Sequence, residues 1–184
     1  MDLTSLGSRN IGATNAFRVL GPWWGALVLV LDCAKGALAA LAPRWLFAAA
    51  GEGWLFWLAL AGGVSAVLGH TLSPWLRFRG GKGVATSLGL FLAILPLPTL
   101  LAFGLWIALF AAGGFRVSVG SIGAALVYPV LVWFLGPPSA QRGVLTAVAA
   151  ALAVFVVLRH RENIRRILAG TEQPILGRRG GGAK

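Results

Sequence analysis

Four short segments of the chain combine glycine or polar residues with basic side chains, a composition that suits the binding of phosphate. The first reads GSRNIGATNAFR, residues 7–18. Its glycines allow the backbone to turn amide groups toward a ligand, and Arg18 adds a planar fork suited to phosphate oxygens. Its candidate ligand-binding residues are Gly7, Ser8, Asn10, Thr14, Asn15 and Arg18. A flexible loop that caps the next helix is an equally good reading of this segment alone.

The second segment reads GHTLSPWLRFRGGKGVATS, residues 69–87. The glycines around Lys82 are Gly80, Gly81 and Gly83. A glycine-rich turn at the start of a helix is an anion site, and a lysine strengthens it. The segment is not a Walker loop, because that motif requires Ser or Thr after the lysine, where this chain has Gly83. We therefore do not expect nucleotide hydrolysis.

The third segment, FRVSVGSIG at residues 115–123, supplies an arginine and two hydroxyl groups, Ser118 and Ser121. Its small residues are also typical of the contact between two membrane helices, so a ligand role and a packing role are both open.

The fourth segment reads HRENIRRILAGTE, residues 160–172. The spacing of His160 and Asn163 places both on one face if the segment is helical. A basic helix resting on anionic lipid would explain the arginines of this segment, but it explains the neighbouring His, Asn and Glu poorly.

The composition indicates that lipid surrounds the elements that carry these segments. Of the 184 residues, 58% are hydrophobic and 11% are charged, whereas about a quarter of a soluble domain is charged. The net charge of +11 does not indicate nucleic acid, because the basic residues lie between long apolar runs. We expect an all-α, polytopic transmembrane helix bundle that forms a single domain over residues 1–184.

Six apolar runs predict about six helices. The runs are 22–42, 54–72, 86–96, 98–114, 119–135 and 143–159. The run 86–96 is too short to span alone, so it is either shielded inside the bundle or continuous with the next run in one kinked element. Pro96 and Pro98 favour a tight turn between the two. The tryptophans suit belts at the membrane interfaces.

Six crossings place both termini on one side of the membrane, and the basic residues test this topology. The opposite side receives only Arg44 and Arg142. The side of the termini receives Arg9, Arg18, Arg77, Arg79, Lys82, Arg116, Arg159, Arg161, Arg165, Arg166, Arg178, Arg179 and Lys184. This bias predicts that the polar segments and a C-terminal tail, residues 160–184, are cytoplasmic.

Asp32 and Lys35 lie three residues apart within the first apolar run. A charge pair in lipid is costly, and we favour a structural pair that braces the bundle over a functional one. His70 is more typical of a hydrogen bond at a helix end than of a catalytic base. We expect no metal or cofactor, because arginine and lysine can hold phosphate without one.

The four segments, with the helix that carries Asp32 and Lys35, together resemble the bacterial acyl-phosphate-dependent glycerol-3-phosphate acyltransferases, the PlsY family. The resemblance covers nearly the whole chain in matching order and spacing. It implies transfer of an acyl chain from acyl phosphate to the 1-hydroxyl of sn-glycerol 3-phosphate, which yields lysophosphatidic acid and phosphate. Because acyl phosphate is already activated, positioning and charge stabilisation are the main requirements, and the donor phosphate itself can accept the hydroxyl proton.

The resemblance also implies roles for residues. The implied catalytic residues, which contact substrate phosphates, are Ser8, Arg18, Lys82, His160 and Asn163. The implied substrate-binding residues are Gly7, Asn10, Asn15, Gly80, Gly81, Gly83, Ser118 and Ser121, and the structural ones are Asp32, Lys35 and Glu172. Arg9 stands where glycine is common in the family.

The family further implies a bacterial inner-membrane location. Its partners would be glycerol 3-phosphate, acyl phosphate, membrane lipids and the enzyme that makes acyl phosphate, without nucleic acid. Family members have seven membrane helices, the first of which precedes the first glycine segment. Since this sequence starts almost at that segment, we expect six crossings.

Two other functions are weighed against this one. A small anion or phosphate transporter would carry inverted repeats, which would place matching loops on opposite membrane faces, whereas these glycine and basic segments share one face. A non-catalytic lipid-binding assembly factor would not need loops so rich in hydrogen-bond donors.

Overall fold

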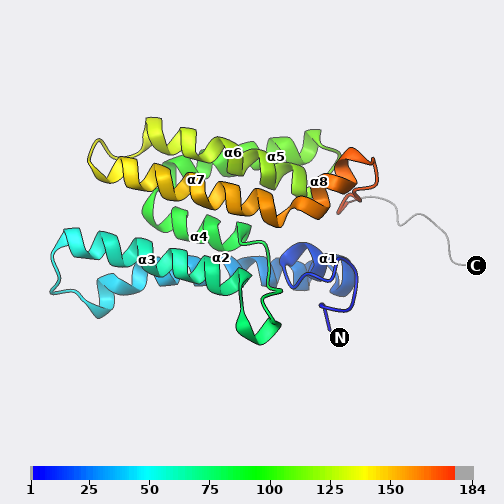
Figure 1. The fold of residues 1–184 in the computed structure, drawn as a ribbon, viewed down its shortest axis with the longest axis horizontal. Coiled ribbons are helices and arrows are strands. Elements are labelled where there is room, and N and C mark those ends of the chain that lie inside the picture. The colour runs from blue at the N-terminus through cyan, green and yellow to red at the C-terminus, as the bar shows by residue number, and fades with distance from the viewer. Residues whose placement is uncertain (1, 177–184) are drawn as a thin grey trace, which may run out of the picture.

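The computed structural model describes residues 2–176, and within them the chain forms eight α-helices, one short 3₁₀ helix and no strand. The helices are α1 (Ala13–Leu20), α2 (Pro22–Leu46), α3 (Glu52–Thr71), α4 (Val84–Ile94), α5 (Pro96–Ala112), α6 (Val117–Leu135), α7 (Gln141–Arg159) and α8 (Arg161–Leu168), and the 3₁₀ helix is η1 (Pro74–Leu76). Figure 1 shows α2 and α3 side by side in one layer and α5, α6 and α7 in another, with α4 between them. The predicted all-α bundle is confirmed.

The six predicted apolar runs correspond to α2 to α7. Four helices, α2, α3, α6 and α7, are long and apolar enough to cross a membrane, and α4 and α5 are shorter apolar helices. Short helices precede and follow these six. The first, α1, occupies the second half of the segment that could also be read as a flexible loop, and the last, α8, confirms the helical spacing expected after α7.

The short helix α4 is shielded by its neighbours. Leu90 is fully buried and Phe91 is nearly so, in a core that α3, α6 and α7 complete with residues such as Val67, Val132 and Leu145. The alternative of one kinked element is wrong, because the backbone leaves the helix between the end of α4 and the proline that begins α5. A helix of eleven residues is therefore stabilised by protein contacts rather than by crossing lipid alone.

Two glycines allow α2 and α4 to approach each other closely. A Cβ atom at Gly89 of α4 would overlap the carbonyl oxygen of Cys33 in α2, and one at Gly36 of α2 would overlap the carbonyl oxygen of Thr86 in α4. Small residues serve in this way where membrane helices pack backbone to backbone. The contact fixes the position of the N-terminus of α4 relative to α2.

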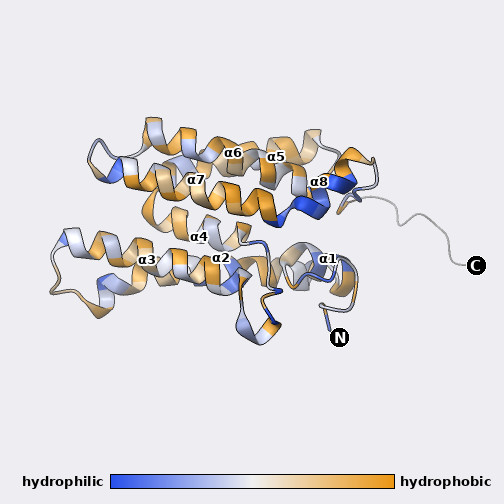
Figure 2. Cartoon of the chain, in the orientation of Figure 1, coloured by the Kyte–Doolittle hydropathy of each residue, from blue (hydrophilic) through white to orange (hydrophobic). Residues whose placement is uncertain are grey.

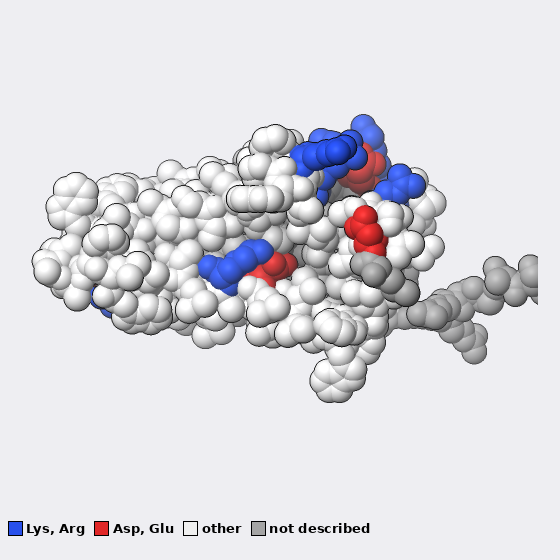
Figure 3. Space-filling model, turned by 90° about the horizontal axis from the view of Figure 1, so that it is seen from below, with Lys and Arg blue, Asp and Glu red and all other residues white. Residues whose placement is uncertain are grey.

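Polar residues gather at one end of the bundle. Figure 2 shows hydrophilic residues concentrated around α1, α8 and the loop before α4, while the helical bodies are mostly hydrophobic. Figure 3 shows the basic side chains of this view mainly at the same end, with a further acidic and basic pair in the middle of the face. The polar segments thus share one end, as expected. Of the basic residues assigned to that side, Arg178, Arg179 and Lys184 lie outside the described residues.

The α2–α4 contact can be tested by adding one methyl group. We expect Gly89→Ala to lower the free energy of unfolding by about 1–3 kcal/mol, the usual cost of overpacking, because the methyl group would overlap the backbone of α2. Gly104→Ala in α5 is the matched control, since nothing lies within 4 Å of a Cβ there. Thermal unfolding in detergent would measure both. Equal midpoints for the two variants would contradict the close contact.

The side of the membrane that each end faces can be tested by cysteine labelling. Arg79, at the polar end, and Glu52, at the start of α3, are both exposed. In a Cys33→Ala background, we expect a membrane-impermeant maleimide to label Glu52→Cys in intact spheroplasts and Arg79→Cys only after permeabilisation. Labelling of position 79 from outside would contradict the predicted topology.

Candidate active site

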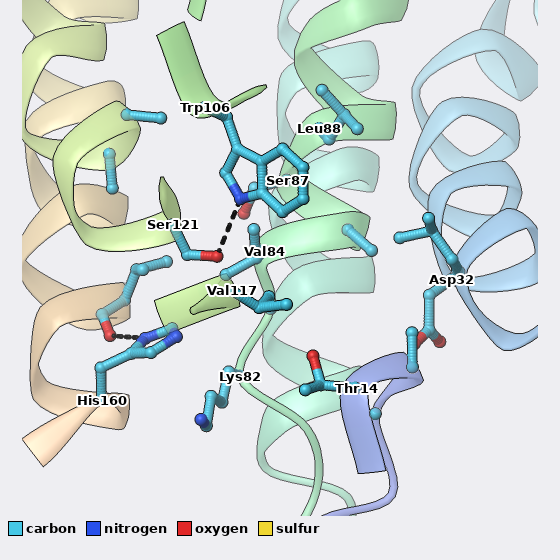
Figure 4. Close-up of a pocket in the computed structure, with 18 of the residues that line it drawn as sticks. Thr14, Asp32, Lys82, Val84, Ser87, Leu88, Trp106, Val117, Ser121 and His160 are labelled. Carbon is cyan, nitrogen blue, oxygen red and sulfur yellow. Dashed lines mark hydrogen bonds between the residues drawn. The ribbon is translucent and has the colours of Figure 1, made fainter. Parts of the chain in front are cut away.

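A cavity of about 640 Å³ opens at the polar end and continues between the helices. Its polar part is lined by all five predicted catalytic residues, Ser8, Arg18, Lys82, His160 and Asn163. The other predicted site residues that line it are Asn10, Asn15, Gly83, Ser118, Ser121, Asp32 and Glu172, whereas Gly7, Gly80, Gly81 and Lys35 are not part of the lining. Figure 4 shows Lys82 and His160 at one side of this space, with Asp32 and Thr14 at the other.

The remainder of the cavity is apolar and comes from residues that no sequence motif indicated. Phe103 and Trp106 of α5, Tyr128 of α6 and Leu152 of α7 line it. Trp106 donates a hydrogen bond from Nε1 to Ser121 Oγ at 3.2 Å, which Figure 4 shows. Trp106 therefore has a contact with the cavity that the prediction of interface belts did not include. Helical periodicity cannot distinguish a cavity wall from a packed core, so this part of the site was not predictable.

Lys82 is the cation at the centre of the polar part. Its ammonium group donates a hydrogen bond to Asn163 Oδ1 at 2.5 Å, across 81 positions of sequence. Burial lowers the pKa of Lys82 to about 8; the Glu172 carboxylate opposes this shift, and the charges of Arg166, Arg18 and Arg159 add to it. An anion that binds beside Lys82 would stabilise the charged form of the lysine and raise its pKa.

The Glu172 carboxylate binds the amide nitrogen of Asn163, whose oxygen binds Lys82. Its Oε1 accepts hydrogen bonds from Asn163 Nδ2 at 2.6 Å and Ser118 Oγ at 2.7 Å, and Oε2 accepts one from Arg166 Nε at 2.6 Å. Burial raises the pKa of Glu172, but these three hydrogen bonds and the Arg166 charge lower it below its usual value. The carboxylate therefore orients Asn163, and through it the ammonium group of Lys82.

The segment after α8 joins this network to α1 and α6. Arg116 Nε donates to the backbone oxygen of Glu172 at 2.8 Å, and Arg18 donates to the backbone oxygen of Gln173, also at 2.8 Å. The amide of Ile175 donates to the backbone oxygen of Phe115 at 2.9 Å. Residues from both ends of the chain thus meet at the mouth of the cavity.

His160 has a defined tautomer. Its Nδ1 lies 2.8 Å from the backbone oxygen of Val156, which can only accept, so Nδ1 carries the ring proton and Nε2 is an acceptor. Burial lowers the pKa of His160 to about 4; the neighbouring Lys82 charge contributes, while the hydrogen bond to Val156 and the charge of Glu172 oppose the shift. At neutral pH the ring is uncharged and can accept a hydrogen bond from a hydroxyl group in the cavity.

The first two glycines of the loop before α4 do not offer their amides to a ligand. The amide of Gly80 donates to the backbone oxygen of Thr71 at 3.2 Å, and that of Gly81 donates to the backbone oxygen of His70 at 3.1 Å. Arg159 donates to the backbone oxygens of both glycines, at 2.9 and 3.1 Å. The amides that remain available begin at Lys82 and continue into the first turn of α4, where the helix dipole favours an anion.

Asn15 organises the first glycine loop. It is 1% exposed; its Oδ1 accepts from the amide of Ser8 at 2.8 Å, and its Nδ2 donates to the backbone oxygens of Leu3 and Leu6. A Cβ atom at Gly7 would overlap this side chain. Arg9 has a φ of 55°, in the left-handed region that favours glycine.

The loop before α4 and the N-terminal loop are also linked to each other. Asn10 Nδ2 donates to the backbone oxygen of Gly80 at 3.3 Å, and Asn10 Oδ1 accepts from the amide of Gly12 at 2.9 Å. The two loops, joined across 70 positions of sequence, therefore form one wall of the cavity mouth. An apolar cavity with a cationic, hydrogen-bonding mouth in a membrane bundle defines a site for an amphiphile that carries an anionic group.

Comparison with known proteins agrees with this class. The family model described as glycerol-3-phosphate acyltransferase matches residues 1–170. The glycerol-3-phosphate acyltransferase of Geotalea daltonii is 41% identical over 94% of this chain and 83% of its own length, and that of Trichlorobacter lovleyi is 44% identical with the same coverage. The chain therefore belongs to the glycerol-3-phosphate acyltransferase family.

Two solved structures are also similar. The crystal structure of PlsY, an integral membrane glycerol 3-phosphate acyltransferase, in its glycerol 3-phosphate form superposes with a TM-score of 0.80 at 36% identity, covering 96% of this chain and 83% of that one. Its lysophosphatidic acid form superposes with a TM-score of 0.76 at the same identity, covering 91% and 81%. The predicted family, the fold class and the multi-pass membrane character are confirmed.

The low pKa of Lys82 predicts how anion binding depends on pH. Lysine is charged below its pKa, so the affinity of the free protein for sulfate, an anion whose charge does not change in this range, should be constant below about pH 8 and fall as the pH rises above it. Calorimetric titration of the purified protein from pH 7 to pH 10 would measure the dissociation constant. Arg18 stays charged throughout this range and should not contribute to the decline.

Lys82→Arg provides the matched control, because a guanidinium group remains protonated over the same range. We expect weaker binding at pH 7 from the altered geometry, but a flat profile up to pH 10. A decline of equal steepness in both proteins would mean that another group titrates.

Proposed function

We propose that this chain transfers an acyl group from acyl phosphate to the 1-hydroxyl of sn-glycerol 3-phosphate, giving lysophosphatidic acid and inorganic phosphate. The observation that supports it best is one cavity with two chemical parts. Arg18, Lys82, His160 and Asn163 line its polar mouth, and aromatic and aliphatic side chains line the rest. An acyl phosphate has the same two parts, an anionic head and an apolar chain.

The mouth offers more cationic groups than one phosphate requires. Lys82 can act as a point charge, and Arg18 can bind two oxygens of one phosphate group with its planar fork. The free amides at the start of α4 add uncharged donors directed at the same region. Two anionic substrates can therefore be held together, so that the attack becomes effectively intramolecular.

Hydrogen-bond donors and an acceptor at the mouth suit the transfer step. The glycerol 1-hydroxyl oxygen attacks the acyl carbonyl carbon, and the bond from that carbon to the phosphate oxygen breaks. His160 Nε2, as a neutral acceptor, orients the hydroxyl group by accepting its hydrogen bond, and as the ester bond forms, the hydroxyl proton passes to the departing phosphate. Lys82 and Ser8 stabilise the charge that develops on the oxygens.

The other predicted residues act through these. Glu172 and Asn163 orient Lys82, and Gly7 and Asn15 shape the loop that presents Ser8. Gly80, Gly81 and Gly83 allow the loop before α4 to pack against α3, while Ser118 and Ser121 line the passage from the mouth to the apolar part.

We place the protein in the bacterial inner membrane, with the polar end in the cytoplasm. The predominance of basic residues at that end supports this orientation. Glycerol 3-phosphate would then enter from the cytoplasm, and acyl phosphate would come from the enzyme that makes it, through the mouth or from the lipid. The alternative of an anion transporter gains no support, because the similar proteins are acyltransferases.

A direct assay on the purified protein tests this function. We expect turnover of glycerol 3-phosphate with acyl phosphate and not with acyl-CoA. Lys82→Ala should lower kcat/KM about tenfold to a hundredfold, because a charge-assisted hydrogen bond contributes roughly 1.5–3 kcal/mol. Arg18→Lys should lose a substantial part as well, since charge alone does not restore the planar fork.

Arg44→Ala is the matched control, because Arg44 is an exposed basic residue at the end of α2 away from the cavity mouth. It should retain the kcat/KM of the unaltered protein. Near-normal efficiency of Lys82→Ala toward both substrates would remove Lys82 from the active site. Absence of acyl transfer by the unaltered protein from either donor would overturn the function itself.

A further inference from the structure

A polar cluster lies outside the predicted catalytic set, between α2 and α3. Lys35 Nζ is 2.5 Å from Asp32 Oδ1 on the same helix and 2.5 Å from His70 Nδ1 on α3, and His70 Nδ1 is 3.4 Å from Asp32 Oδ1. His70 lies in the last turn of α3 and makes the hydrogen bond expected at a helix end, with Lys35 of α2 as its partner. Charged residues among apolar helices have a high energetic cost, and such residues commonly have a role beyond helix packing.

The contact with Lys35 determines which ring nitrogen of His70 carries the proton. A lysine ammonium group has donors only, so His70 Nδ1 must accept from Lys35 and the ring proton must be on Nε2. Asp32 Oδ1 accepts a second hydrogen bond from Lys35, which fixes the direction of the ammonium group. The side chain of His70 is 5% exposed, so its ring has little freedom to turn.

The fixed ring packs on the glycine loop. A Cβ atom at Gly81 would overlap His70 Nε2, and one at Gly80 would overlap the backbone oxygen of His70. The same backbone oxygen accepts the amide of Gly81. His70 therefore contacts the loop through both its backbone and its ring, and the next residue of the loop is Lys82.

We propose that Asp32, Lys35 and His70 form a positioning relay, in which the ion pair on α2 orients the His70 ring and the ring holds the glycine loop so that Lys82 faces the substrate phosphate. The proposal rests on the proposed function for its kinetic readout only. It gives the three residues a role in substrate binding, whereas a pair that only braced two helices would affect folding alone.

An apolar double variant separates these two roles. The side chains of Lys35 and Asp32 are 39% and 13% exposed and lie among apolar helices. Replacing both members of an ion pair in apolar surroundings by apolar residues of similar size is often neutral or stabilising. We expect Asp32→Leu/Lys35→Met to retain its unfolding midpoint in detergent but to raise the KM for glycerol 3-phosphate about tenfold, with less than about threefold change in kcat and in the KM for acyl phosphate. An unchanged KM for glycerol 3-phosphate in a folded double variant would overturn the relay.

The order of the relay gives a second test. If the pair acts through the ring, His70→Ala should raise the same KM, and adding Asp32→Leu/Lys35→Met to it should have little further effect, because coupled residues are not additive. His70→Gln, whose amide can approach the position of Nε2, should recover part of the loss. Fully additive effects of the pair and the ring would contradict the relay.

Binding of glycerol 3-phosphate, measured by calorimetry without turnover, keeps this test separate from the proposed function. Weaker binding in the double variant and in His70→Ala supports the relay even if the unaltered protein transfers no acyl group. In a Lys82→Ala background, the relay variants should cause no further loss. A further loss of the full size in that background would show that the cluster does not act through Lys82.

Discussion

The energetic cost of holding a lysine ammonium group out of bulk water is the constraint on which much of this structure depends. Lys82 is partly buried, and its immediate hydrogen-bond partner is the neutral amide oxygen of Asn163 rather than a carboxylate. The nearest counter-charge in this network, Glu172, is separated from it by that amide. A direct ion pair would satisfy Lys82 and compete with an anionic ligand, whereas the amide orients the cation and leaves its charge available.

Many hydrogen bonds at the polar end help to hold the Lys82 ammonium group in position. Glu172 is held by Ser118 and Arg166, so the carboxylate that orients Asn163 is itself fixed in position. The segment that carries Glu172 is in turn bound by Arg18 of α1 and by Arg116, which directly precedes α6. The site is thus a hydrogen-bonded assembly of side chains from the beginning, the middle and the end of the described chain. Its parts can be in register only when the helices are packed.

The packing of α4 determines where the glycine loop ends. Gly36 and Gly89 allow α2 and α4 to meet backbone to backbone, and the loop before α4 then passes directly under the end of α3. The glycines of this loop serve close packing as much as anion binding, since two of their amides are bonded to carbonyl groups of His70 and Thr71. The glycines of this motif therefore have packing contacts that the anion-binding interpretation of the sequence did not include.

The sequence alone determined that this is a helical membrane protein of one acyltransferase family. Apolar runs of the right length must be helical in lipid because their backbone groups have no other partners there, and the order of four glycine and polar segments is specific to the family. The tertiary structure decided whether the short helix α4 is shielded, which amides remain free, and that Lys35 contacts His70 across 35 positions. It also brought the apolar wall of the cavity together from α5, α6 and α7. These features depend on distances between helices, and a helix presents the same periodic pattern to a neighbour, to lipid and to a cavity.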